Sequence, residues 1–293
     1  MKAFGSYHPT VLLIYFLSVL LIAMFTVNPV ILVLALIGGI CFCSIMNRPK
    51  EILNNLLFYI PLFLMIAITN PLFSHNGVTP LFFLNGNPVT LEAILYGFDI
   101  ALMIVAVMYW FKCHNYIMTS EKILYLFGEI IPKLSLLLSI VLRFVPLFKT
   151  QIKKVHQMQK AMGLYSSNSY VDKIRSGLRV FSAILMWSIE NAVDTGDSMK
   201  ARGYGLKGRS HFSMFHFTLQ DGIVMGIIIT NLTIVIVGML FHTTEFYFYP
   251  RMTEIPQTPL AWTVYISFGI LCFLPFIIEI KENLKWKYYV SKI

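Results

Sequence analysis

Charged side chains are scarce in this 293-residue chain, because Asp, Glu, Lys and Arg together make up only 13% of it. Ordinary soluble domains contain about 25% charged residues, so the composition excludes that class. Cysteine is scarce too, and all four cysteines lie inside apolar segments, where we expect buried free thiols. Cys41 and Cys43 lack a second pair of ligands at a spacing typical of a metal site.

Motifs of catalysis are also missing. The sequence contains no G-x-x-x-x-G-K-[ST] loop, no H-E-x-x-H, no G-x-S-x-G and no paired aspartate-rich motif for a Mg²⁺-bound diphosphate. His211 and His216 are five residues apart, a spacing that does not place them on one helix face. We therefore expect a non-catalytic chain that holds no metal or cofactor of its own.

Apolar residues, at 57%, dominate the chain and occur in long blocks. About 20 apolar residues suffice for a helix to cross a bilayer. The sequence predicts an all-α, polytopic membrane protein of about six spans, at residues 11–27, 30–46, 52–70, 93–113, 218–240 and 260–280. The first span follows Lys2 as in a signal peptide, but no clear small-residue cleavage site follows it, so we expect a retained helix.

Basic residues predict the orientation of these spans. Residues 71–90 contain no Lys or Arg, and residues 241–259 contain only Arg251. Cytoplasmic loops carry an excess of Lys and Arg, so these two loops are expected outside. Both termini and every basic loop then lie on the cytoplasmic side of the membrane.

The polar stretch 143–209 separates the apolar blocks. It carries twelve cationic and four acidic side chains, a net +8 of the chain's +9. Membrane topology accounts for this basic excess without a nucleic-acid partner. We predict three parts: 1–119 with about four spans, a cytoplasmic or interfacial domain at 120–210, and 211–293 with about two spans and a basic tail.

Two long amphipathic helices are predicted in the middle domain. Residues 133–162 are expected along the membrane interface, and residues 172–202 carry one apolar stripe with charges opposite. They end in Ala161-Met162-Gly163 and in Ala201-Arg202-Gly203. Glycine ends a helix, and arginine offers a planar fork for a carboxylate, so such a tip suits an acidic groove on a partner protein.

The sequence at this point resembles a known family, the transmembrane T component of energy-coupling factor (ECF) transporters, related to the cobalt-transport permease CbiQ. His8-Pro9-Thr10 and Asn28-Pro29 look like the opening of that family, and 142–146 resembles its L-R-F-x-P signature through Arg143 and Pro146. The stretch 198–205, which contains Lys200, closely matches the second coupling motif. The first motif is expected as Ala-Arg-Gly. Here Met162 replaces the arginine, so this tip would dock by packing, with Lys160 or Lys154 supplying charge.

The resemblance implies a mechanical role. T components couple two cytosolic ABC-type ATPases, which bind the ATP, to a membrane-embedded S component that binds a vitamin or a transition-metal ion. The helices at 133–162 and 172–202 would then be coupling helices in a lipid-embedded subunit that is not itself an enzyme. The resemblance also implies the plasma membrane of a prokaryotic cell.

Two other functions remain open from the sequence. A membrane enzyme acting on lipids would use acids such as Glu190, Asp194 and Asp197, which share a helix face. We expect these acids instead to be solvated or paired with Arg175, Arg179 and Lys200. A secondary transporter would need broken helices and polar residues at mid-membrane, and the spans are too uniformly apolar for that. Asp99, about two turns into the fourth span, fits either a functional role or a buried packing contact.

Overall fold

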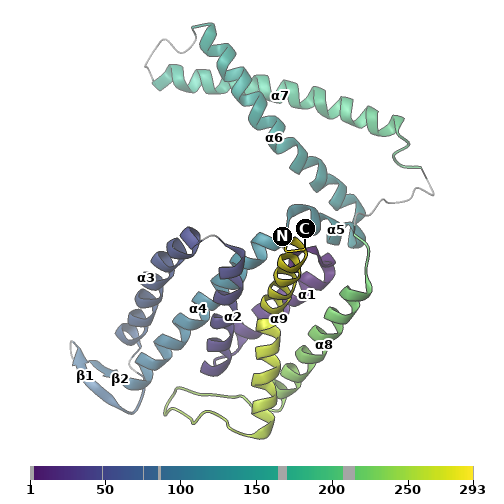
Figure 1. The fold of residues 1–293 in the computed structure, drawn as a ribbon. Helices are drawn as coiled ribbons and strands as arrows, with labels where there is room; N and C mark the ends of the chain where they lie inside the picture. The colour runs from purple at the N-terminus through teal and green to yellow at the C-terminus, as the bar shows by residue number, and fades with distance from the viewer. Residues whose placement is uncertain are drawn as a thin grey trace. The chain divides into compact units, whose positions relative to one another are not determined.

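The computed structural model describes residues 3–47, 49–74, 76–84, 87–163, 170–206 and 215–292. The chain forms two compact units, one made of 1–123 with 215–293 and the other of 124–214. The predicted boundaries at 119/120 and 210/211 stay a prediction. The elements, drawn in Figure 1, are η1 (Phe4–Ser6), α1 (Pro9–Phe25), α2 (Pro29–Met46), α3 (Pro49–Phe73), β1 (Pro80–Leu84), β2 (Asn87–Thr90), α4 (Leu91–Ile117), α5 (Ser120–Ile130), α6 (Pro132–Ala161), α7 (Tyr170–Ala201), α8 (Leu219–Leu240) and α9 (Pro259–Val290).

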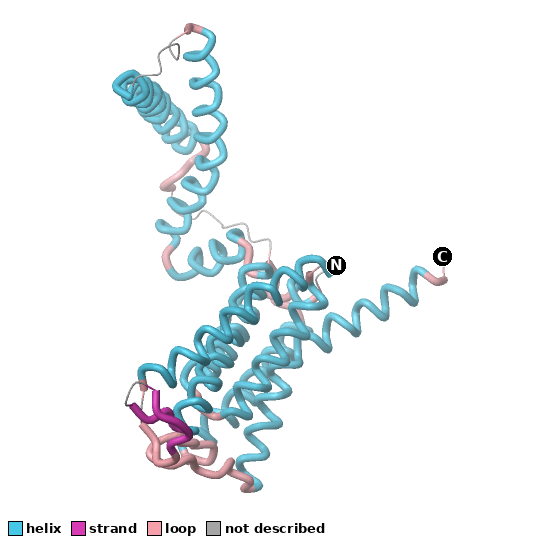
Figure 2. The backbone as a smooth tube through the Cα atoms, turned by 90° about the vertical axis from the view of Figure 1, so that its left-hand side faces the viewer, coloured by secondary structure: helices cyan, strands magenta, loops and turns pink. Residues whose placement is uncertain are grey.

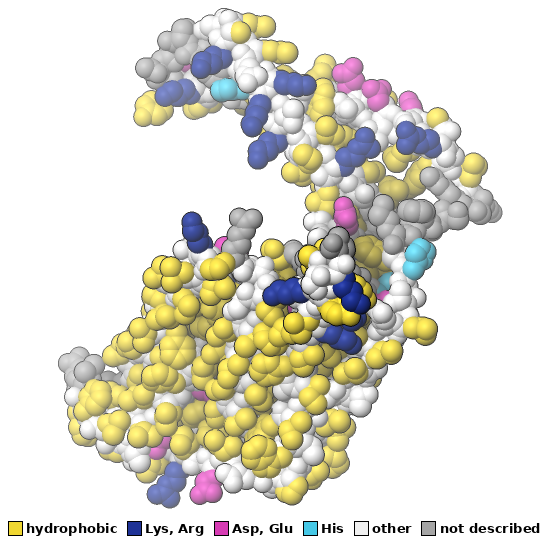
Figure 3. Space-filling view, viewed as in Figure 1, with side chains coloured by type: hydrophobic (Ala, Val, Ile, Leu, Met, Phe, Trp, Pro, Cys, Tyr) yellow, Lys and Arg dark blue, Asp and Glu magenta, His cyan; other side chains and the backbone are white. Residues whose placement is uncertain are grey.

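The prediction of an all-α polytopic protein is confirmed. Among the described residues, α2, α3, α4, α6, α8 and α9 are long and apolar enough to cross a membrane. The predicted set of six differs in one member, because α1 has only 17 residues and α6 qualifies in its place. The first half of α6 is mostly apolar, with Lys133 and Arg143 as its only charged residues, and further basic residues follow from Lys149 onward. Figure 3 shows the broad apolar surface of the larger unit.

The core of the larger unit is aromatic. Trp110 on α4 is fully buried, and its ring lies 6.0 Å from that of Tyr15 and 6.3 Å from that of Phe42. Its indole N–H donates to the carbonyl of Ala35 on α2 at 2.9 Å, so the buried polar end of the ring has a partner.

Small residues let these helices approach each other. A Cβ atom on Gly38 would lie 2.8 Å from the Cβ of Cys272, so α2 and α9 meet at this glycine. Close backbone approach at small residues is how helices associate in a bilayer, where burial of apolar surface drives little.

Hydrogen bonds gather the N-terminal segment and several helix ends at one end of the larger unit. Glu279 on α9 accepts from the N–H of Phe4 at 3.0 Å, and Asp221 at the start of α8 accepts from the N–H of His8 at 2.8 Å. Lys122 donates to the carbonyl of Gly5. Lys122 and Thr218, which flank the second unit in sequence, therefore lie at this same end.

The opposite end of the larger unit carries the two loops predicted to be external. Asn28, the N-cap of α2, donates to the carbonyl of Thr244 in the loop 241–258 at 2.9 Å. The 71–90 region contains an antiparallel ribbon that the composition did not predict, in which β1 pairs with β2. Figure 2 shows the strands beside the long loop.

Glu92, in the first turn of α4, anchors the segment just before β1 through hydrogen bonds. Its carboxylate accepts from the hydroxyl of Thr79 at 2.7 Å and from the N–H groups of Val78 and Thr79 at 3.4 Å each. Gly77 approaches closely, because a Cβ there would lie 2.6 Å from Glu92 Oε2. Its φ of 137° also lies in a region that favours glycine.

Gly77→Ala is therefore expected to destabilise the ribbon by about 1–3 kcal/mol, through backbone strain and displacement of Glu92. Faster amide hydrogen exchange at residues 76–84 and 87–92 checks this. Gly226→Ala is the matched control, because no atom outside its own helix lies within 4 Å of a Cβ there; equal exchange in both variants would contradict the role of Gly77.

Candidate functional site

In the smaller unit, α6 and α7 form an antiparallel pair. The ring of Phe148 packs edge-on against Trp187 with centroids 5.5 Å apart, and Ser176 donates to Gln159 Oε1 at 3.2 Å. Eleven residues separate the two contact positions on each helix, in opposite chain directions. This register places the end of α6 near the start of α7, and from there the two helices run in opposite directions (Figure 1).

The two predicted tips therefore lie at opposite ends of the pair. Extending the register places Met162 opposite Lys173. Lys173 lies 28 residues before Ala201, the last residue of α7. At 1.5 Å per residue the tips are separated by about 42 Å along the helix. The structure does not bring Ala161-Met162-Gly163 and Ala201-Arg202-Gly203 into one site; it presents two separate tips.

Left-handed glycines end both helices. At the end of α7, Gly203 has φ +78°, its N–H donates to the carbonyl of Lys200 at 2.9 Å, and the N–H of Tyr204 donates to that of Met199 at 3.0 Å. These two bonds form a Schellman motif. At the end of α6, Gly163 has φ +73° and its N–H donates to the carbonyl of Lys160 at 3.1 Å.

The side chains at both tips point into open space. Arg202 is exposed and has no ion pair within the described part of the chain. Lys200, two residues before it, pairs with Asp197 at 3.4 Å. Met162 is 72% exposed, next to the exposed Lys160. The first tip thus offers an apolar contact and the second a free guanidinium.

The supporting residues of the L-R-F-x-P signature lie in the middle of α6. Arg143 and Pro146 are both exposed. The helix continues through Pro146, and the hydroxyl of Thr150 donates to the carbonyl of Pro146 at 3.0 Å. That carbonyl thus keeps a side-chain partner within the helix.

Helix α7 has three faces rather than the two that were predicted. The face that packs on α6 carries Ser176 and Trp187, with the half-buried Val180 and Ile184 between them. The charged residues occupy a second face. The predicted apolar stripe forms the third and remains 45–66% exposed, at Ile174, Leu178, Phe181, Leu185 and Ile189.

Acidic residues on α7 do not form a closed site. Asp197 is exposed and paired with Lys200, and Glu190 and Asp194 are exposed. No group of three or more His, Cys, Asp or Glu side chains among the described residues could hold a metal ion. His211 lies outside the described residues.

Comparison with known proteins places the chain in a family. Residues 6–214, which include both tips and both long helices, match the family model CbiQ, described as cobalt transport protein. The chain belongs to the CbiQ family. The match ends before α8, so the family features are concentrated in α1–α7.

Curated relatives of this CbiQ-family chain share one name. This chain is 33% identical over 106 residues to the energy-coupling factor transporter transmembrane protein EcfT of Listeria innocua. That alignment covers 34% of this chain and 40% of the relative. The chain is 28% identical over 123 residues to EcfT of Brevibacillus brevis, covering 40% of this chain and 46% of the relative. The alignments thus span less than half the length of these relatives.

Proposed function

We propose that this chain is the transmembrane coupling subunit of an ECF-type ABC importer. In this role it transmits the ATP-driven motion of two cytosolic ATPases to an S component, which binds a vitamin or a transition-metal ion for uptake. The CbiQ match and the EcfT relatives support the transporter class. The chain itself performs no catalysis and binds no cofactor, since its partners bind the ATP.

The separation of the tips is the observation that carries this proposal. Two exposed helix ends about 42 Å apart suit contacts with two different protein subunits, one per tip. The difference between Met162 and Arg202 suits two grooves that are not identical, one apolar and one acidic. The antiparallel packing of α6 on α7 makes the two tips ends of one rigid lever.

The exposed apolar stripe of α7 supplies the other half of the coupling. Its side chains lack cover within the described residues, and an exposed apolar face of this size marks an interaction surface. We assign this stripe to the S component. Apolar contacts lack the directional geometry of hydrogen bonds, so the partner can shift along the helix when the tips move.

The basic residues orient the chain. The end of the larger unit that holds Phe4, Lys122 and Thr218 is continuous in sequence with the basic stretch 143–209. The positive-inside rule places that end, both termini and the two tips in the cytoplasm. The ribbon and the loop 241–258 then face outward.

Co-purification tests the proposal. The chain is expressed with the ABC ATPases and S components of its host, solubilised in mild detergent and isolated through a tag on α9. We expect two ATPase subunits and one S component per chain. A folded, monodisperse chain that retains no ATPase would overturn the proposal and favour a lipid-modifying membrane enzyme, which is then assayed on lipid substrates without ATP.

A further inference from the structure

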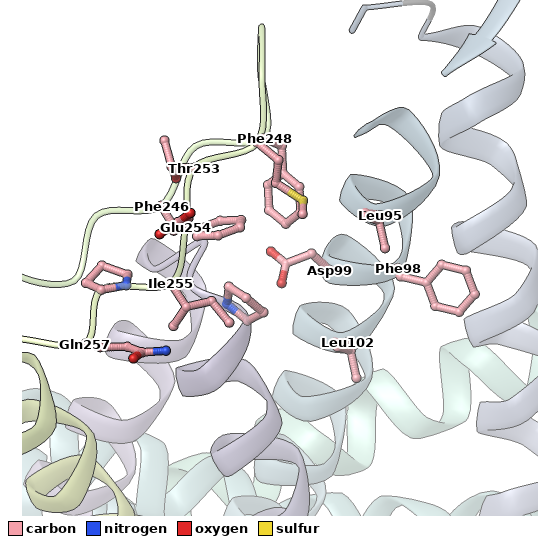
Figure 4. A pocket seen from close by; sticks show the side chains of 13 residues that line it. Leu95, Phe98, Asp99, Leu102, Phe246, Phe248, Thr253, Glu254, Ile255 and Gln257 are labelled. Carbon is pink, nitrogen blue, oxygen red and sulfur yellow. The ribbon is translucent and has the colours of Figure 1, made fainter. Parts of the chain in front are cut away.

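A cavity of about 860 Å³ lies in the larger unit, at the end that carries the loop 241–258. One wall is α4, where Leu95, Phe98, Asp99 and Leu102 recur at helical spacing on one face. The other walls are Pro29 at the start of α2 and loop residues 246–257, chiefly Phe246, Phe248 and Met252–Gln257. Figure 4 shows these side chains around the cavity. Its volume falls within the range of sites for small organic ligands, roughly 300–1,000 Å³.

Asp99 is the unusual member of this lining. Its side chain is 3% exposed, and its Oδ1 atom is buried without a hydrogen-bond partner in the described part of the chain. In Figure 4 its carboxylate points from α4 toward the loop that carries Phe246 and Glu254. An ionised carboxylate buried without a partner is costly, and such a group is otherwise held neutral. A bound cation would therefore stabilise its ionised form. None of the residues that line the cavity is cationic.

Hydrogen bonds and aromatic contacts fix the loop 241–258 where it closes the cavity. Asn28 donates to the carbonyl of Thr244 at 2.9 Å, and the rings of Tyr96 and Phe248 lie 5.4 Å apart. Thr253 and Tyr247 exchange hydrogen bonds at 3.0 Å. These contacts fix the aromatic wall opposite Asp99, so the cavity is preformed.

We propose that this cavity binds an organic ammonium group with an apolar body. The ammonium would donate to Asp99 and lie against the rings of Phe246 and Phe248, since aromatic faces attract cations. Glu254, exposed at the cavity wall, adds a second negative charge. A bare metal ion fits poorly, because most of the wall is apolar and oxygen ligands are few.

Two sources could present this chemistry: a free amine from solution, and the headgroup of an ethanolamine lipid whose chains remain in the bilayer. Both require the same contact with Asp99. The proposal is independent of the coupling role, since none of the lining residues belongs to α6 or α7.

The test begins with the full chain in nanodiscs of phosphatidylglycerol, titrated with n-hexylammonium chloride by calorimetry. We expect saturable binding that Asp99→Asn weakens at least tenfold, because a charge-assisted hydrogen bond is lost. The neutral n-hexanol should not bind. In a second arm, native mass spectrometry compares retention of phosphatidylethanolamine and phosphatidylglycerol by wild type and by Asp99→Asn.

Glu245→Gln is the matched control. Glu245 lies in the same loop, does not line the cavity, and as Gln still accepts the hydrogen bond from Tyr247; hexylammonium affinity should stay within about twofold of wild type. Glu254→Gln changes an exposed side chain and should weaken binding about two- to fivefold, so it covers the case in which Asp99→Asn misfolds.

The binding and lipid-retention measurements distinguish a free-amine site, a lipid-headgroup site and failure of the proposal. Asp99-dependent binding of hexylammonium supports a free-amine site, and Asp99-dependent retention of phosphatidylethanolamine alone assigns the cavity to a lipid headgroup. Absence of both, or equal binding by wild type, Asp99→Asn and Glu254→Gln, overturns the proposal. Loss of ATPase co-purification would leave this result unchanged, so failure of one proposal does not imply failure of the other.

Discussion

Reversal of charge at the second tip, Arg202→Glu, is expected to weaken binding of the partner ATPase by about 30-fold or more. Arg202 is exposed just beyond the end of α7 and has no ion pair in the described part of the chain, so its guanidinium is free for a carboxylate in the groove that we propose on the partner. Loss of one side of a desolvated charge pair costs about 2–5 kcal/mol. The measurement is ATPase retention on the immobilised chain, followed by a dissociation constant in detergent.

Arg179→Glu is the control for general electrostatics. It makes the same change in charge on the same helix, but at an exposed position away from either tip. We expect at most a severalfold loss of affinity, and this loss should disappear in high salt because exposed charges are screened. Equal losses from both variants would show that Arg202 acts only through the net charge of α7, and no loss from Arg202→Glu would remove it from the interface.

Truncation of the central aromatic side chain, Trp110→Ala, is expected to destabilise the larger unit by about 3–5 kcal/mol. The ring is fully buried among Tyr15, Phe16 and Phe42, and lipid chains cannot fill the cavity that its loss would leave. The hydrogen bond from its indole N–H to Ala35 would also be lost. We expect the thermal midpoint to fall by about 5–10 °C.

Buried thiols provide the readout for this variant. Cys43, Cys113 and Cys272 are buried, so a thiol-reactive fluorophore reports their exposure on heating. Trp110→Phe keeps an aromatic ring and loses the hydrogen bond, and it should lower the midpoint by less than half as much. A surface substitution would shift the thermal midpoint by only about 1–2 °C. If Trp110→Ala shifts it no more than that, Trp110 does not lie at the centre of the core.

The sequence by itself determined the class of the protein and the chemistry of its two tips. The blocks that form α2, α3, α4, α8 and α9 were recognisable because spanning length is a local property of composition. The tips were recognisable because a glycine just beyond an amphipathic helix ends it locally, as Gly163 and Gly203 do with positive φ. The resemblance to the CbiQ family depended on the same short segments.

Only the tertiary structure decided how these parts are combined. The spans are apolar all round, so no stripe in the sequence shows which face meets a neighbour; close approaches such as that of Gly38 to Cys272 decide it. The register of Phe148 with Trp187 separates the two tips and leaves the stripe of α7 uncovered. Asp99 faces a cavity because α2, α4 and the loop 241–258 converge there. Contacts between segments so far apart in the chain depend on packing in three dimensions, which local sequence patterns do not encode.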